Sequence, residues 1–489
     1  MTNEDRLGRE RCRRAVEVAT AAGATCVDSR VVDLAAEHLA VRNASVEGVQ
    51  QSVSTGLGVR VMAGGRWGFA ATGDLGPSAV EAAARLAVAV ADAGRLAGGP
   101  EVHLAEVEPV QATWATPLVE DPFSVPLGDK LELLVRAGET MMAVEGVGVA
   151  EGRLHAWRRR SRFVSSEGAD IAQTIVQCGG GIAATAVGDA ETQIRSYPNS
   201  HGGDFAGRGY ELIRDLDLLG HAGRVGEEAV ALLAAPVCPS GETTLVLDGS
   251  QVALQVHESI GHPVELDRVL GTEAAYAGTS FLTPGDIGRL RYGSSLLNVV
   301  ADATTPGALG TFGYDDEGVA ATSTPIVHEG TFAGFLSSRE TAATLRLGAS
   351  GATVRAQSWA HLPLIRMTNV SLLPGSATSL DELLDGVERG VYLETNRSWS
   401  IDDRRVDFQF GTEWGREIRN GRLGPVVRNG VYAGRTQPFW SSLDALGGAA
   451  LWKAWGLPNC GKGQPAQVGY VAHGAAPARF RGVLVGGAR

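Results

Sequence analysis

The segment His257-Glu258-Ser259-Ile260-Gly261-His262-Pro263 constrains this chain more than any other feature of its sequence. It places two imidazoles around a carboxylate at the end of a helix predicted over residues 251–261, with Ser250 as its N-cap. The earlier residues of this helix are mostly apolar. A buried, apolar helix has little reason to carry these three side chains together unless they bind a metal ion or perform chemistry. The alternative is a helix end where His262 caps carbonyls and His257 is a satisfied core histidine.

The spacing of the two histidines is one residue longer than in the familiar His-Glu-x-x-His pattern. On a regular helix, residues i and i+4 lie roughly 40° apart and residues i and i+5 roughly 140° apart. His257 and His262 would therefore not converge on one ion. Gly261 tolerates unusual dihedral angles, and Pro263 disfavours the α region at His262. The sequence thus predicts that the helix loosens at the second histidine, in the form of a π-bulge.

The residue types of this segment are those of a catalytic zinc site. Such sites use imidazole, thiolate or carboxylate donors, with three protein ligands and one open position. Glu258 is then placed as the general base that takes a proton from a water attacking a carbonyl. The residues themselves leave the third ligand open between Glu265, Asp267 and the distant Cys460, which lies in a Pro/Gly-bounded loop.

Hydrophobic periodicity predicts an α+β chain of two domains within its 489 residues. A cluster of Pro and Gly near residue 236 marks the boundary. Residues 1–236 form a mixed α/β N-terminal domain, with helices predicted over 4–22, 78–97, 128–142 and 225–235 and strands over 45–71 and 160–188. Residues 237–489 form a β-rich C-terminal domain that carries the metal-site helix, with a strand at 243–247, a helix at 380–388 and a hairpin at 417–423.

Charge and cysteine usage narrow the class of protein. The net charge of −12 argues against a nucleic-acid-binding protein. The one dense basic run, Arg158-Arg159-Arg160 with Arg162, is interpreted as a solvated strand or turn edge. No apolar stretch is long enough for a membrane span, and the charged residues 1–14 predict no secretory signal. Five scattered cysteines form no disulfide framework, so we expect a cytoplasmic protein.

Several segments together connect the chain to a known family. Residues 244–248 lead into the metal segment 257–267, and further motifs follow at 313–318, 366–370, 418–422 and 460–464. Residues 56–61 and 68–70 add an early hairpin. In these segments, which extend over nearly the whole chain, the sequence resembles the TldD/PmbA family of zinc metallopeptidases. The metal segment is the most specific part of the resemblance.

The resemblance implies a TldD-type subunit, because PmbA-type subunits lack the metal motif. His257, His262 and Cys460 would hold one Zn²⁺ per chain, and Glu258 would be the catalytic base. The implied function is zinc-dependent hydrolysis of unfolded peptides, bound along a sheet edge inside a closed dimer. That dimer would be a homodimer or a heterodimer with a PmbA-type subunit. The alternatives are an amidase acting on a small-molecule amide of a specialised-metabolite pathway and a non-catalytic subunit of a peptidase complex.

The sequence does not assign the groups around the metal. Glu265 and Asp267 are candidates for orienting the imidazoles. A group that stabilises the oxyanion is also required, and four residues are conceivable without one being assigned. They are Tyr314, Arg366, Arg404 and His473.

Overall fold

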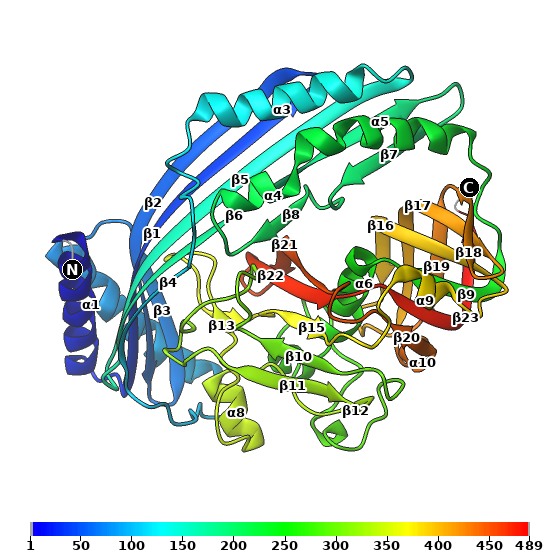
Figure 1. Ribbon diagram of the computed structural model, residues 1–489. Coiled ribbons are helices and arrows are strands. Elements are labelled where there is room, and N and C mark those ends of the chain that lie inside the picture. The colour runs from blue at the N-terminus through cyan, green and yellow to red at the C-terminus, as the bar shows by residue number, and fades with distance from the viewer. Residues whose placement is uncertain (1–2, 488–489) are drawn as a thin grey trace.

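A computed structural model describes residues 3–487 (Figure 1). Its first half is built on one eight-stranded sheet with the order β3-β2-β1-β5-β6-β4, in which β7 and β8 also pair with β6. The sheet arches over the second half of the chain (Figure 1). Its strands are β1 (Cys26–Arg42), β2 (Ser45–Ala63), β3 (Arg66–Thr72), β4 (Gln111–Ala115), β5 (Val147–Ser165), β6 (Asp170–Val187), β7 (Thr192–Tyr197) and β8 (Asp204–Ala206).

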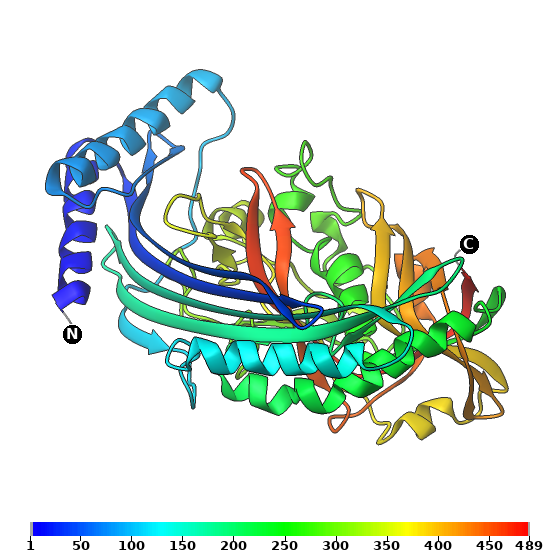
Figure 2. The ribbon, with the colours of Figure 1, turned by 90° about the horizontal axis from the view of Figure 1, so that it is seen from above.

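Helices cover the outer face of this sheet, as Figures 1 and 2 show from two directions. They are α1 (Asn3–Ala21), α2 (Pro77–Gly94), α3 (Leu127–Met142), α4 (Glu211–Leu216) and α5 (Leu218–Ala234). Successive side chains of a strand point to opposite faces. In β1, Val27 packs with α1 and α2, and Leu39 with α3 and α5. Asp28, Arg30 and His38 lie on the opposite face, toward the second half of the chain.

The second half contains several smaller sheets. The largest has the order β16-β9-β23-β19-β17-β18, and a further pairing of β16 with β17 closes part of it into a ring. Its strands are β9 (Gly241–Leu247), β16 (Arg389–Ile401), β17 (Asp407–Arg419), β18 (Arg422–Val427), β19 (Gly430–Arg435), β20 (Leu443–Leu446) and β23 (Ala478–Gly487). The other strands are β10 (Val299–Asp302), β11 (Ser323–His328), β12 (Thr331–Phe332), β13 (Val354–Arg355), β14 (Leu364–Ile365), β15 (Val370–Leu372), β21 (Lys453–Lys462) and β22 (Gln467–Ala475).

The helix α6 (Gly249–Val256) lies in the largest hydrophobic core, where every one of its residues is buried. Asp248 caps its N-terminus by accepting hydrogen bonds from the backbone N–H groups of Ser250 and Gln251. The remaining helices of the second half are short: α7 (Leu266–Val269), α8 (Arg339–Leu345), α9 (Leu380–Leu384) and α10 (Thr436–Ser441). Between residues 3 and 487, no helix is long and apolar enough to cross a membrane.

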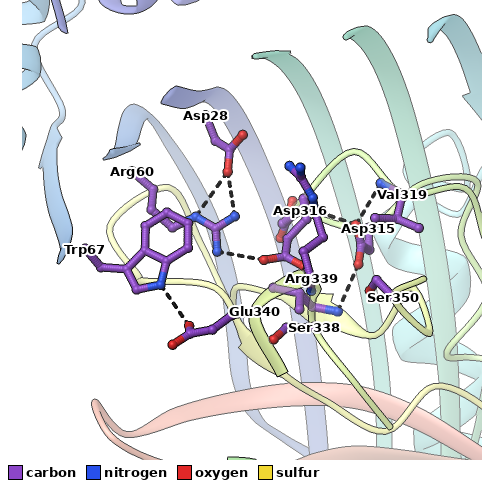
Figure 3. Close-up of polar contacts among 12 residues, drawn as sticks. Asp28, Arg60, Trp67, Asp315, Asp316, Val319, Ser338, Arg339, Glu340 and Ser350 are labelled. Atoms are coloured by element: carbon purple, nitrogen blue, oxygen red, sulfur yellow. Dashed lines mark hydrogen bonds and ion pairs between the residues drawn. The ribbon is translucent and has the colours of Figure 1, made fainter. Parts of the chain in front are cut away.

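A buried polar network joins the two halves (Figure 3). Arg60 of β2 donates to Asp28 of β1 at 3.1 Å and to Glu317 of the second half at 3.1 Å. Glu317 also accepts a hydrogen bond from the backbone N–H of Arg339 at 2.8 Å. The interface between the sheet and the second half is thus fixed by charged groups as well as by packing.

The α+β class is confirmed, with a mixed first half and a strand-rich second half. The division at residue 236 remains a prediction, consistent with sheets that do not mix β1–β8 with β9–β23. The hairpin around Asn420-Gly421 is confirmed, because β17 and β18 pair across it.

Three expectations about local structure need correction. The α6 cap is Asp248, whereas the sequence pattern favoured Ser250, which instead donates its N–H to the cap. The helix predicted over 78–97 begins at Pro77 and ends at Gly94. The run from Arg158 to Arg162 is no solvated edge, since β5 lies between β1 and β6 in the middle of the sheet. Arg159 pairs there with Asp316 and Arg162 with Asp170, whereas Arg160 is exposed.

Candidate metal centre

The helix that follows α6 changes its winding at the paired histidines. Residues His257–Gly261 form a π-helical turn, in which His262 N–H donates to the His257 carbonyl at 3.1 Å. The Ser259 carbonyl accepts a hydrogen bond from the Tyr292 hydroxyl at 2.6 Å, which satisfies a backbone group of the widened turn. The predicted π-bulge is confirmed. It places the two imidazole rings 4.7 Å apart between centroids.

The third side chain of this cluster comes from β21, about 200 residues farther along the chain. Cys460 lies opposite Gly469 in the β21–β22 hairpin, and its thiol lies close to the two imidazoles. One ligand atom from each of His257, His262 and Cys460 lies within 4.8 Å of the other two. The three residues are 3%, 5% and 2% exposed, so they form a closed group inside the protein.

Hydrogen bonds on the far side of each imidazole fix its orientation. His473 Nδ1 lies 2.8 Å from the Val370 carbonyl, which requires a proton on that nitrogen. Its Nε2, 2.7 Å from His257 Nδ1, is then the acceptor, so His257 carries its proton on Nδ1. His262 Nδ1 donates to Glu265 at 3.0 Å. Both ligand histidines therefore keep Nε2 free as a donor atom for a metal.

A buried ionic group anchors the Cys460 strand to the histidine helix. Lys462 lies 3.3 Å from Glu265 and 2.8 Å from Asp267, and it is fully buried. Arg268 lies 3.6 Å from Glu265 on its other side. Burial opposes ionisation of Glu265, but Lys462 and His262 hold its pKa below the ordinary value. Glu265 thus orients His262 as an anion, whereas Asp267 contacts Lys462 and neither imidazole.

The protonation of the cluster suits metal binding. Burial lowers the pKa of His257 to about 4 and also lowers that of His262, so both are neutral at pH 7. Burial opposes ionisation of the Cys460 thiol, but Arg366 and His262 bring its pKa below the ordinary value. Arg366 donates to the backbone carbonyl of Cys460. Neutral imidazoles and a thiolate are the forms that bind a metal.

The Glu258 carboxylate is paired with Arg405, which lies on the turn between β16 and β17. Their side chains are 7% and 14% exposed, respectively, so the ion pair is largely shielded from water. Arg405 has a φ of +66°, a left-handed conformation that is unusual for a residue other than glycine. Such conformations are held at sites by the surrounding structure, and here the turn directs a guanidinium at Glu258.

The structure shows what each residue proposed to stabilise the oxyanion contacts. His473 contacts His257, and Arg366 contacts the backbone of Cys460. The Arg404 carbonyl accepts a hydrogen bond from the backbone N–H of Phe281. The following residue, Arg405, is the one that contacts Glu258. Tyr314 packs at the junction with the first half, beside Phe163. Sequence reasoning missed Arg405 and Lys462, although Lys462 lies within the motif 460–464.

Comparison with known proteins identifies the family. A model described as the PmbA/TldA metallopeptidase C-terminal domain matches residues 240–487, which is more than half of the chain. Models of domain 1 and of the central domain of the same family match residues 27–91 and 120–235. The chain belongs to the PmbA/TldD metallopeptidase family.

Proteins similar to the chain match all or part of its length. A metalloprotease of Synechocystis sp. is 30% identical over 453 residues, 92% of each chain. A zinc metalloprotease TldD homologue of Saccharolobus solfataricus is 28% identical over about half of each chain. The fold is also that of TldE from Thermococcus kodakarensis, with a TM-score of 0.70 and 15% identity over 98% of this chain and 100% of that one.

Proposed function

We propose that this chain is a zinc-dependent peptidase in which His257, His262 and Cys460 hold the metal and Glu258 is the general base. One observation carries the proposal. A π-helical turn and a strand from a distant part of the sequence bring the three ligand atoms within 4.8 Å of one another, beside a carboxylate. Neighbours from other segments orient each imidazole, as at metal sites in general.

The donor set fits zinc. Two neutral imidazoles and a thiolate are ligands that zinc accepts in catalytic sites, where a fourth position stays open. The relative from Saccharolobus solfataricus, which is named a zinc metalloprotease, supports the same metal. When bound, the metal would lower the pKa of a water molecule and polarise the carbonyl under attack.

The residues of the chain would supply the remaining chemistry. Glu258 takes the proton of the attacking water at its carboxylate and delivers it to the nitrogen of the leaving amine. Arg405 holds one oxygen of that carboxylate and leaves the other for the proton. His473 and Glu265 keep the two ligand imidazoles in the required tautomer. Burial of the site keeps bulk water from competing for these hydrogen bonds.

We further propose that the substrate is an unfolded peptide and that the protein acts as a dimer in the cytoplasm. Relatives named metalloproteases support a peptide substrate. The likeness to TldE in fold supports a partnership of the TldD/TldE type. The division into domains 1–236 and 237–489 is part of this proposal, with the metal centre carried by the second domain.

Zinc content tests the ligand assignment directly. Protein purified without chelators and supplied with zinc should contain about one zinc per chain, because three fixed ligands are typical of a tightly held ion. Cys460→Ala should lose most of it. Cys238→Ala is the matched control, since Cys238 is a buried cysteine of the same half outside the cluster. Absence of zinc from the wild type, or unchanged zinc in Cys460→Ala, would contradict the assignment.

The base is tested by separating metal binding from turnover. Glu258→Ala removes the proton acceptor without removing a ligand, so it should retain zinc and lose peptide hydrolysis by a factor of about 10² or more. The measurement is turnover of an unfolded peptide beside the metal content of the same sample. Near-wild-type turnover in this variant would assign the base to another residue.

A further inference from the structure

A cavity lies beside the candidate metal centre, between the arched sheet and the β21–β22 hairpin. Its volume is about 310 Å³. Strands β1, β2, β5 and β6 line one side, and residues 355–358, Arg366 and 468–470 line the other. Trp157 of β5 and Tyr470 of β22 approach to 4.7 Å between ring centroids, so the two walls meet there. A cavity of this size holds part of an extended peptide rather than a folded partner.

All the charged residues that line this cavity are positively charged. Four arginines line it, and neither an aspartate nor a glutamate is among its lining residues. Two of the four belong to the basic run of β5 that the sequence suggested was a solvated edge. The arginines are Arg158, Arg159, Arg355 and Arg366.

Two of these arginines have no carboxylate partner within residues 3–487. Arg355 donates to the backbone carbonyls of Tyr470, at 2.8 Å, and Met367. Arg366 donates to those of Gln467, at 3.2 Å, and Cys460. Carbonyl oxygens accept from these N–H groups, so no carboxylate neutralises either charge in direct contact, although the Cys460 thiol lies near Arg366. Burial and the neighbouring Arg366 lower the pKa of Arg355 to about 10, which reflects the repulsion between two close cations.

The other two arginines are only partly neutralised. Arg159 donates to Asp316 at 2.9 Å, but Asp316 is shared with Arg30 at 3.3 Å. The side chain of Arg158 points to the outer face of the sheet, where it lies over Phe123 and pairs with Asp121 at 3.4 Å, so its charge does not enter the cavity. The three arginines whose side chains face the cavity each keep a buried Nε–H without an acceptor in the described part of the chain; they are Arg159, Arg355 and Arg366. The walls therefore hold more positive charge and more donors than the protein itself balances.

We propose that this cavity binds a carboxylate of the peptide substrate and so directs hydrolysis toward peptides that carry one. The guanidinium group presents paired N–H donors that match a carboxylate, and its charge would be compensated on binding. The proposal rests on the proposed function, because a peptide supplies the ligand. It names a substrate class that the metal centre alone does not select.

The position of Arg366 connects the cavity to the bond that is cleaved. Its guanidinium contacts the backbone of Cys460, a proposed metal ligand, and Gly469 on the paired strand lines the cavity. An extended residue spans about 3.3 Å, so a carboxylate bound near Arg366 lies within about three residues of the attacked amide. Leu34 and Ile175 give the opposite wall an apolar surface for the carbon atoms next to the carboxylate.

A peptide offers this carboxylate either at its C-terminus or on an acidic side chain. Four internally quenched peptides of one sequence separate these sources. They combine a central Glu or Gln with a C-terminal acid or amide, and kcat/KM is measured for each with zinc-loaded protein. We expect the peptide that lacks both carboxylates to be cleaved about ten- to a hundredfold more slowly, the range for hydrogen bonds to charged groups. The single replacements identify the source.

Substitutions of the cavity arginines test whether the preference for a peptide carboxylate arises in the cavity. Arg355→Gln should reduce the ratio between the best and the poorest peptide toward one, mainly through KM, and Arg355→Lys should restore part of it. Arg159→Gln is a second variant in case Arg355→Gln does not fold, because the Arg159 side chain lies on the face of β5 that lines the cavity. Arg160→Gln is the matched control, because this exposed arginine of the same strand does not line the cavity. Its ratio should equal that of the wild type.

Binding measurements keep this inference distinct from the proposed function. The dissociation constants of the same four peptides are measured with Glu258→Ala by fluorescence anisotropy. Cleavage of all four peptides at one rate would overturn the carboxylate site and leave the peptidase proposal standing. Binding that depends on the carboxylate and on Arg355, with no hydrolysis by the wild type, would uphold the site and overturn the peptidase. A preference that Arg355→Gln and Arg159→Gln retain would place the carboxylate elsewhere.

Discussion

Arg405 is the residue whose contact says most about how the candidate base works. Its guanidinium holds Glu258 in a nearly buried ion pair. Arg405→Ala should therefore lower kcat by a factor of about 10² or more, since general-base catalysis depends on the position of the base. Zinc content should be unchanged, because Arg405 contacts no proposed ligand.

The neighbouring Arg404 provides the control for this prediction. Its known contact is a backbone hydrogen bond from Phe281, so Arg404→Ala should leave kcat near the wild-type value. Arg405→Lys should recover part of the activity by keeping the charge, although it loses the planar fork of the guanidinium. If Arg405→Ala turned over peptide as fast as the wild type, the pair with Glu258 would have a structural role alone.

At the residue scale, the sequence predicts the site residues that lie close together along the chain. His257, Glu258 and His262 stand out because they interrupt an apolar helix within six positions. Cys460 entered through a family resemblance and not through spacing. Arg405 and Lys462 carried no signal, since their contacts span 147 and 195 positions and depend on the path of the whole chain.

The π-helical turn is the element on which the centre depends. The fourth residue between the histidines would turn them apart on an α-helix, and the widened turn brings them to the same side. Gly261 permits this close packing, because a Cβ there would lie 2.1 Å from the Met367 sulfur. The spacing and Gly261 pointed to this loosened helix. The expected effect of Pro263 is wrong, since His262 keeps an α conformation with φ −67° and ψ −43°.

Gly261→Ala should disturb the turn through that clash. We expect a loss of about 1–3 kcal/mol in the free energy of unfolding, as for overpacked cores, together with reduced zinc content. Metal analysis and urea unfolding of the same samples measure both effects. Gly128→Ala is the control, because a Cβ in that helix meets open space. The double variant Gly261→Ala/Met367→Ala should regain zinc, and a failure to do so would show that the clash is not the cause.

Helix ends were less predictable than helix existence. The sequence pattern favoured Ser250 as the cap of α6, and the structure uses Asp248, whose carboxylate accepts two backbone hydrogen bonds. Both residue types are good caps, so composition alone could not separate them. The basic run of β5 was misplaced for a similar reason. An arginine-rich strand is usually exposed, and here Arg159 pairs with Asp316, which is distant in sequence.

At the scale of the whole molecule, the two halves are joined by charge as well as by apolar contact. The sequence predicted the α+β class, but it held no information on which carboxylates would meet which arginines. Arg60 lies between Asp28 and Glu317 and is 7% exposed. Although burial opposes it, these two carboxylates raise the pKa of Arg60 above its ordinary value. The arginine therefore stays charged and depends on its partners.

Glu317→Ala tests how strongly this network holds the halves together. The substitution removes an acceptor of Arg60 and the acceptor of the Arg339 backbone N–H, and it leaves both donors buried. Removing one partner of a buried ion pair typically destabilises a protein by about 3–5 kcal/mol. We expect a loss of this size in the free energy of unfolding, measured from urea denaturation followed by tryptophan fluorescence. Glu317→Gln keeps an acceptor and should lose less.

An exposed ion pair of the same protein gives the comparison for this result. Glu81 and Arg14 lie 2.7 Å apart on the surface of the first half, with side chains 26% and 50% exposed. Glu81→Ala should change the free energy of unfolding far less than Glu317→Ala does, because solvent already screens that pair. Equal effects of Glu81→Ala and Glu317→Ala would mean that burial at the junction adds nothing. A large effect of Glu317→Ala alone would make the network a principal contact between the sheet and the half that carries the metal centre.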